Sequence, residues 1–387
     1  MKRIKELDLT KTFIIVVSMI GIHTMYDLAD VGPSLPTSVL NVLATAWGAP
    51  VFMFCMGIVL GFSRHNEARD MLRRGVHLIT IGMALNVLRY APLAFKAYAV
   101  SDPGLIKGLA QIFNVDILQF AGLAFMLLAL CKRLRMGSWS VLGLSVVMSV
   151  VGTLLIGHYT SSYMVNQVLG YFYHTPTCSC FPLLNWFIFV AAGKVMGEVV
   201  YSSESRHASS LRNISVFIIC GIIAIVHQYL SITGNCPWFR TLENDWEFYS
   251  MPTQDALCIA FGVAPFEIGV FWLLAKIIPD NWMSVLGYPA RHINQFYCVS
   301  WVWIMWIACF LWFIRPATTF AEFVVVWIVI VALTTVTVVV YNRWLKERVA
   351  PWFGRYEKAW NIAVWVVIVG FGVWYFTNIP GPYIMPY

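Results

Sequence analysis

Asp8-Leu9-Thr10-Lys11, eleven uncharged residues and then His23 form the stretch that decides the fold of this chain. It predicts a membrane-spanning helix with charges at its inner end and an imidazole near its outer end. Because an α-helix rises about 1.5 Å per residue, His23 lies roughly 18 Å beyond Lys11, within a hydrocarbon core about 30 Å thick. Ionisable groups inside membrane segments are costly and mark functional sites. His23 is therefore a candidate functional residue; the alternative is a histidine that caps the helix and hydrogen-bonds a neighbour.

Composition extends this interpretation to the whole chain. Of its 387 residues, 59% are hydrophobic and 12% are charged, whereas soluble domains carry about 25% charged residues. We therefore predict an integral membrane protein that forms a single domain over residues 1–387. The net charge of +7 fits loops that set orientation in a membrane, so we expect membrane lipids as partners and no nucleic acid.

Eleven apolar stretches of sufficient length predict an all-α polytopic fold with about eleven transmembrane helices. Lys and Arg gather in alternate loops, and acidic residues lie in the opposite ones, which predicts a cytoplasmic N-terminus and an extracytoplasmic C-terminus. The basic start has no small-residue cleavage site after it, so we expect the first helix to be retained. The expected spans lie near residues 11–29, 37–62, 73–98, 115–131, 138–157, 181–201, 212–233, 255–277, 293–314, 320–341 and 359–377.

The nine cysteines predict no metal site, because no Cys/His spacing matches a structural zinc centre. Six of them lie in apolar runs and are expected to pack as small side chains. The other three, Cys178, Cys180 and Cys236, fall in loops expected outside the membrane. A disulfide from Cys236 to either Cys178 or Cys180 is compatible with the sequence, which does not choose between them.

Polar residues near the outer ends of several spans form a candidate site. A histidine beside a carboxylate is the usual arrangement of a general base, because the carboxylate orients the imidazole and stabilises its protonated form. Asp116 is the preferred partner of His23, and Asp27, one turn after His23, is the next. The alternative for Asp116 is a helix cap, since an acid is favoured where a helix begins. The full set is His23, Arg89, Asp116, Gln119, Asn185, His227 and Gln228.

Basic residues also gather at the inner ends of the expected spans. Arg64, Arg73 and Arg74 precede or begin the third span, and Arg133 and Arg135 follow the fourth. A basic mouth of this kind could receive a phosphorylated donor, because Arg binds phosphate through two hydrogen bonds. The alternative is that these residues only fix orientation. No Gly-rich phosphate-binding loop is present.

The order of several motifs resembles the bacterial relatives of heparan-α-glucosaminide N-acetyltransferase, in the transmembrane acyltransferase superfamily. The likeness covers residues 8–200 well, and residues 201–387 add further helices that match loosely. It is carried by Asp8-Leu-Thr-Lys11…His23, Gly48-Ala-Pro-Val-Phe-Met-Phe-Cys-Met-Gly57, Arg74-Gly75…Asn86…Arg89, Asp116-Ile-Leu-Gln-Phe-Ala-Gly-Leu-Ala124 and Phe181-Pro-Leu-Leu-Asn-Trp186…Gly193…Gly197, and more weakly by Leu286-Gly287…Asn294-Gln-Phe-Tyr297.

The resemblance implies a membrane-bound acyltransferase that moves an acyl group, expected to be acetyl, from cytosolic acyl-CoA to a carbohydrate amine or hydroxyl on the far side. It implies that His23 is the catalytic histidine, as general base or acyl acceptor. We expect Asp116 to orient His23, and Gln119 or Asn185 to donate to the reacting carbonyl oxygen. Acetyl-CoA is the expected donor and a sugar or glycan the acceptor, in a bacterial inner membrane; a homodimer is compatible. The expected donor contacts are Lys11, Arg64, Arg73, Arg74, Arg89, Arg133 and Arg135.

Two departures from the family pattern keep alternatives open. The family usually has Arg-Gly where this chain has Lys11-Thr12, and the spacing from the basic residue to His23 is one residue longer. A helical bulge would absorb the extra residue; otherwise the donor contact is altered, or the chain is not catalytic. The rival functions are a transporter or flippase, which intramembrane charges such as Glu267 suit but the lack of an internal repeat does not, and a non-catalytic membrane component.

Overall fold

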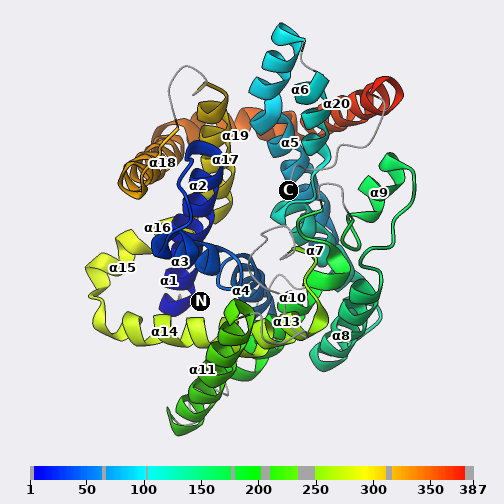
Figure 1. The fold of residues 1–387 in the computed structure, drawn as a ribbon. Coiled ribbons are helices and arrows are strands. Elements are labelled where there is room, and N and C mark those ends of the chain that lie inside the picture. The colour runs from blue at the N-terminus through cyan, green and yellow to red at the C-terminus, as the bar shows by residue number, and fades with distance from the viewer. Residues whose placement is uncertain are drawn as a thin grey trace.

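The computed structural model describes residues 4–62, 67–101, 103–175, 179–201, 210–233, 249–310 and 316–379. Regular structure in these residues is helical, with two isolated bridges, Ala29 to Ala317 and Val115 to Ser179. The all-α fold class is therefore confirmed (Figure 1).

Helices of the described residues lie within each of the eleven expected stretches. In the first half of the chain the elements are α1 (Lys5–Phe13), η1 (Ile14–Met19), α2 (Ile20–Leu28), α3 (Leu35–Ala44), α4 (Ala49–Phe62), α5 (Ala68–Val100), α6 (Pro103–Gly108), η2 (Leu109–Phe113), α7 (Ile117–Arg133), α8 (Ser138–Leu154), α9 (Tyr163–Leu169) and α10 (Leu183–Tyr201). The second half has α11 (Ser210–Thr233), α13 (Thr253–Cys258), η4 (Ile259–Val263), α14 (Ala264–Ile277), α15 (Asp280–Leu286), α16 (Tyr288–Arg291), α17 (Ile293–Phe310), α18 (Phe320–Val340), η6 (Tyr341–Leu345), α19 (Lys346–Arg355) and α20 (Glu357–Asn378).

Eight of the helical stretches in the described residues are long and apolar enough to cross a membrane, which makes this an integral membrane protein. Of the other three expected spans, α7 and α8 have 17 residues each, and the described part of α11 includes an apolar stretch at residues 215–231. A total of eleven spans, and the orientation of the termini, stay predictions. The eight are Lys5–Leu28, Leu35–Phe62, Ala68–Val100, Leu183–Tyr201, Thr253–Ile277, Ile293–Phe310, Phe320–Arg355 and Glu357–Asn378.

The first span is one continuous helical stretch with a π-helical segment in its middle. Segment η1, Ile14–Met19, lies between Lys11 and His23. A π-bulge accommodates one additional residue in a helix. The long spacing between Lys11 and His23 is thus absorbed by a bulge, which was one of the alternatives that the sequence left open.

Helices α4 and α10 pack with their backbones in contact. A Cβ atom added to Gly57 would lie 2.1 Å from the carbonyl oxygen of Val190, and one added to Gly193 would lie 2.1 Å from that of Phe54. Gly197 is similarly close to Ile58. Glycines spaced four residues apart permit such close helix approach inside a membrane. These glycines belong to the stretches that carry the family resemblance.

Helices α5 and α7 run antiparallel. Gly75 and Gly122 face each other, since a Cβ on either would lie 2.6 Å from the other's carbonyl oxygen. Further along α5, Gly82 leaves room for the Gln119 side chain. These contacts run in opposite order along the two helices, so the later part of α5 lies beside the start of α7.

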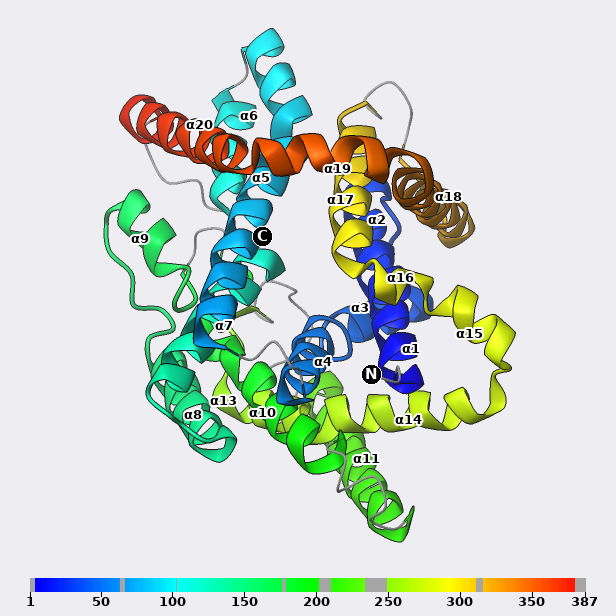
Figure 2. The same cartoon turned by 180° about the vertical axis from the view of Figure 1, so that it is seen from behind.

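Helix α17 completes the surroundings of this region by packing against both α2 and α5. The views in Figures 1 and 2 both show α17 alongside α2. The indole N–H of Trp306 on α17 donates to the carbonyl oxygen of Leu88 on α5, at 3.0 Å. Near the N-terminus, α1 packs against α14 and α16, and the Thr12 hydroxyl donates to the carbonyl oxygen of Leu286, at 2.7 Å.

Candidate active site

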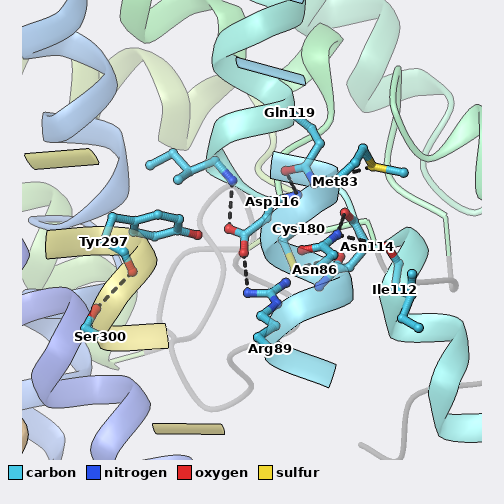
Figure 3. Close-up of polar contacts among 11 residues, drawn as sticks. Met83, Asn86, Arg89, Ile112, Asn114, Asp116, Gln119, Cys180, Tyr297 and Ser300 are labelled. Carbon is cyan, nitrogen blue, oxygen red and sulfur yellow. Dashed lines mark hydrogen bonds and ion pairs between the residues drawn. The ribbon is translucent and has the colours of Figure 1, made fainter. Parts of the chain in front are cut away.

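A buried ion pair between Arg89 and Asp116 lies at the centre of the candidate site. Asp116 is the N-cap of α7: its Oδ1 accepts from the backbone N–H of Ile117 at 2.7 Å, and its Oδ2 accepts from Nη1 of Arg89 at 2.7 Å (Figure 3). The Gln119 side chain accepts from the Asp116 backbone N–H at 3.3 Å, which completes a capping box. The helix-cap interpretation of Asp116 is therefore correct, and Gln119 supports the same cap.

Asn86 fixes the chain just before Asp116. Its side-chain amide donates to the carbonyl oxygens of Ile112 at 3.0 Å and Asn114 at 2.9 Å (Figure 3). Asn86 and Arg89 lie three residues apart on one face of α5. This single helix face thus positions Asp116 twice, through the preceding loop and through the carboxylate itself.

His23 reaches this ion pair from α2. Its ring lies against the indole of Trp301 on α17, with ring centroids 4.0 Å apart. The guanidinium of Arg89 lies 4.4 Å from the centroid of the same indole ring. The charges of Asp116 and Arg89 both act on the His23 imidazole. His23 is half-buried, whereas Arg89 is 1% exposed and Asp116 7% exposed.

His23 interacts with Asp116, its preferred predicted partner, through charge and not through a hydrogen bond. Among the described residues no hydrogen bond joins His23 to Asp116, whose oxygens bond to Arg89 and to the start of α7. Asp27, the second predicted partner, is exposed on α2 and is not hydrogen-bonded to His23 either. Asp116 therefore acts on His23 across space, and a direct contact between them stays a prediction.

Two aromatic residues of α17 also belong to this site, and the sequence did not single them out for it. Tyr297 is 4% exposed, and its ring points toward the Asp116 carboxylate (Figure 3). Its hydroxyl hydrogen-bonds to the Asp116 carboxylate and interacts with the Trp301 indole. Trp301 follows one turn later on the same face. The available signal was the spacing of two aromatic side chains with polar tips. Tyr297, but not Trp301, belongs to the weakest stretch of the family resemblance.

The other predicted site residues lie in a second cluster. Asn185 donates to the carbonyl oxygens of Ser250 at 3.4 Å and Met251 at 3.1 Å, which joins α10 to the segment before α13. His227 on α11 pairs with Asp255 on α13, at 3.1 Å. In the part of the chain that the structure describes, neither Asn185 nor His227 contacts His23. The predicted constellation is thus divided between two places.

The predicted donor contacts gather mostly at the opposite end of α5 and α7. Arg73 and Arg74 lie near the start of α5, and Arg133 and Arg135 lie at and just beyond the end of α7, all exposed. Because α5 and α7 are antiparallel, these four residues share one end of the helix pair. Arg89 lies about 22 Å further along α5 than Arg74, so it belongs to the His23 site. Arg64 is outside the described residues.

Lys11 lies on α1, half-buried, and forms no ion pair with another described residue. Its charge acts on the buried thiol of Cys55 on α4, as does that of Glu267 on α14. Glu267 is 3% exposed, and neither of its carboxyl oxygens has a hydrogen-bond partner among the described residues.

Of the three loop cysteines, Cys180 lies in the described part of the chain. The Cys180 thiol donates to the side-chain oxygen of Asn114, at 3.4 Å. Cys178 and Cys236 lie outside the described residues, so the disulfide stays a prediction. Within the described ranges no three His, Cys, Asp or Glu side chains gather as a metal-binding group.

Comparison with known proteins identifies one family. The family model described as heparan-alpha-glucosaminide N-acetyltransferase, catalytic, matches residues 3–231, more than half of the chain. The matched region includes His23, Arg89 and Asp116, whereas Tyr297 and Trp301 lie beyond it. Searches of curated proteins and of solved structures gave no match.

Proposed function

This chain belongs to the heparan-α-glucosaminide N-acetyltransferase family, and on that premise we propose that it transfers an acetyl group from cytosolic acetyl-CoA to an amine or hydroxyl of an extracytoplasmic carbohydrate. The membrane helices and the family make it a membrane acyltransferase. The observation that carries the proposal is the half-buried His23 imidazole beside the Arg89–Asp116 ion pair, inside the matched region.

In the proposed reaction His23 is the general base. The acceptor nitrogen or oxygen attacks the carbonyl carbon of the thioester, and His23 takes the proton that the acceptor loses. The C–S bond then breaks, and the CoA thiolate leaves with the proton that His23 held. The negative charge of Asp116 favours the transient imidazolium. His23 suits this role because it is the more exposed member of the cluster.

The exposed basic residues at the far end of α5 and α7 are the proposed contacts of the donor. Arg73, Arg74, Arg133 and Arg135 would bind the phosphates of acetyl-CoA, because guanidinium groups match phosphate oxygens in pairs. Arg74 is partly held by the ring of Phe125, whose centroid lies 4.7 Å from its guanidinium carbon. The acyl end of the donor would then extend along the helix pair toward His23.

The test is acetyl-CoA turnover by the purified protein with a panel of amino sugars and sugar alcohols. We expect turnover by the wild type and a loss of about 10²-fold to 10⁴-fold in His23→Ala, the usual contribution of a general base. His77→Ala is the matched control, since His77 is an exposed histidine on α5, and it should keep wild-type activity. Full turnover by a folded His23→Ala variant would remove His23 from the mechanism.

A further inference from the structure

The backbone just before Asp116 is held by side chains from two sides. On one side Asn86 of α5 binds two of its carbonyl oxygens, as described above. On the other side Gln167 of α9 donates from Nε2 to the carbonyl oxygen of Phe113, at 2.8 Å. Gln167 is 4% exposed, so this hydrogen bond is shielded from solvent. The residues that lead into α7 therefore lie between α5 and α9.

The chain that follows α9 extends this attachment as far as the residue before Asp116. The backbone N–H of Cys180 donates to the carbonyl oxygen of Val115, at 3.2 Å, and Val115 forms a parallel bridge with Ser179. The Cys180 thiol reaches the side chain of Asn114 (Figure 3). Val115 is fully buried. Three successive residues before Asp116 are thus bound by α9 and by the chain after it.

Helix α9 is short, and side chains determine where it begins. It has seven residues, and a helix of that length is marginal without tertiary contacts. Asn166 fixes its first turn, because its side-chain amide donates to the carbonyl oxygen of Thr160 at 2.8 Å and its side-chain oxygen accepts from the Thr160 backbone N–H at 2.8 Å. The next residue, Gln167, is thereby directed at Phe113.

We propose that Gln167 is a positioning residue, which holds the Phe113 carbonyl oxygen and so fixes the Asp116 carboxylate relative to His23. The inference rests on the proposed function, in which the Asp116 charge favours protonated His23. No hydrogen bond joins the two described side chains, and a charge that acts across space weakens as the distance grows. Gln167 touches neither donor nor acceptor in this scheme, so its loss should lower kcat more than it raises KM.

The experiment compares Gln167→Met with the wild type in the acetyl-CoA assay. Methionine keeps the length of the side chain and removes the N–H donor. We expect kcat to fall by about 10-fold to 10²-fold, as misplacement of a catalytic group does, with little change in KM for acetyl-CoA. The thermal midpoint checks that the variant is folded.

A second background separates positioning from a general loss of structure. Once Asp116→Asn has removed the charge, Gln167→Met should cause no further fall in kcat, because nothing remains for Gln167 to position. If Asp116→Asn does not fold, the double variant Asp116→Asn/Arg89→Gln, which lacks the unpaired buried charge, takes its place. An equal fold-loss from Gln167→Met with and without the Asp116 charge overturns the inference.

Gln254→Met is the matched control. Gln254 lies on α13, and no hydrogen bond links it to residues 112–116 in the part of the chain that the structure describes. It should keep wild-type kcat. A folded Gln167→Met variant with wild-type kcat, or with only a raised KM, overturns the inference while the proposed function stands. Absence of wild-type turnover with every acceptor overturns the proposed function and the inference with it.

Discussion

Asp116 shows how one side chain serves both the fold and the candidate chemistry. It caps α7, pairs with Arg89 and acts electrostatically on His23. The cap could be predicted, because an acid opening a helix is a local pattern. The ion pair could not, since Asp116 and Arg89 lie on different helices and the pairing depends on how α5 and α7 are rotated against each other.

Substitutions of Arg89 and Asp116 should have strongly coupled effects on the free energy of unfolding. Asp116→Asn keeps the size of the side chain but leaves the buried Arg89 charge without its partner, so we expect a loss of about 3–5 kcal/mol in unfolding free energy. Adding Arg89→Gln removes the unpaired charge and should restore part of that loss. A double-mutant cycle measured by denaturant unfolding in detergent checks this. Additive effects of the two changes would mean that the ion pair contributes no coupling.

Tyr297 and Trp301 show what single-residue patterns leave out. Both lie in an apolar span, where aromatic residues normally pack against lipid or neighbouring helices. Their polar groups can be assigned to the candidate site only when α17 is known to pack beside α2 and α5. Asn185 is the opposite case: it matched a family stretch and was expected near His23, yet it bonds to the backbone at Ser250 and Met251.

At the scale of elements, the helices themselves were well predicted because apolar length specifies them. For the spacing from Lys11 to His23 the sequence left a bulge as one of several alternatives, and η1 supplies it. The packing of α4 on α10 depends on glycines whose spacing was visible in the sequence. Which helix they face was not, because small residues permit close approach without selecting the partner.

Adding one methyl group between α4 and α10 should lower the free energy of unfolding. A Cβ at Gly193 would lie 2.1 Å from the Phe54 carbonyl oxygen, so we expect Gly193→Ala to cost about 1–3 kcal/mol, as overpacking does. This outweighs the gain of up to about 1 kcal/mol that alanine offers a helix.

Gly370→Ala on α20 is the control for this contact, since nothing lies within 4 Å of its added Cβ. It should leave the midpoint of thermal unfolding unchanged or raise it. Equal effects of Gly193→Ala and Gly370→Ala on that midpoint would contradict the close packing of α4 and α10.

At the scale of the whole molecule, eight helices qualify as membrane spans, and the remaining expected spans determine the topology. Eleven spans place the two termini on opposite sides, whereas an even number places them together. Alternating basic loops predict a cytoplasmic N-terminus and an extracytoplasmic C-terminus. Reporter fusions at each end should therefore respond oppositely to compartment. The same response from both reporters would rule out an odd number of spans.

The candidate site combines helices of the region that the family model matches with a helix that follows it. The family match ends within α11, yet α17 contributes Tyr297 and Trp301 to the candidate site. The basic residues proposed to bind the donor lie at the other end of α5 and α7 from Arg89 and Asp116. A donor bound at one end and a base near the other is the arrangement that transfer across a membrane requires.

The most direct measurement is acetyl transfer across a sealed membrane. The protein is reconstituted in vesicles with radiolabelled acetyl-CoA on the side of the basic residues and the amino-sugar acceptor on the other. We predict labelled acceptor in the opposite compartment for the wild type, and none for His23→Ala. Labelled acceptor that forms only when donor and acceptor share one side would contradict transmembrane transfer, and equal labelling by the two proteins would contradict catalysis by His23.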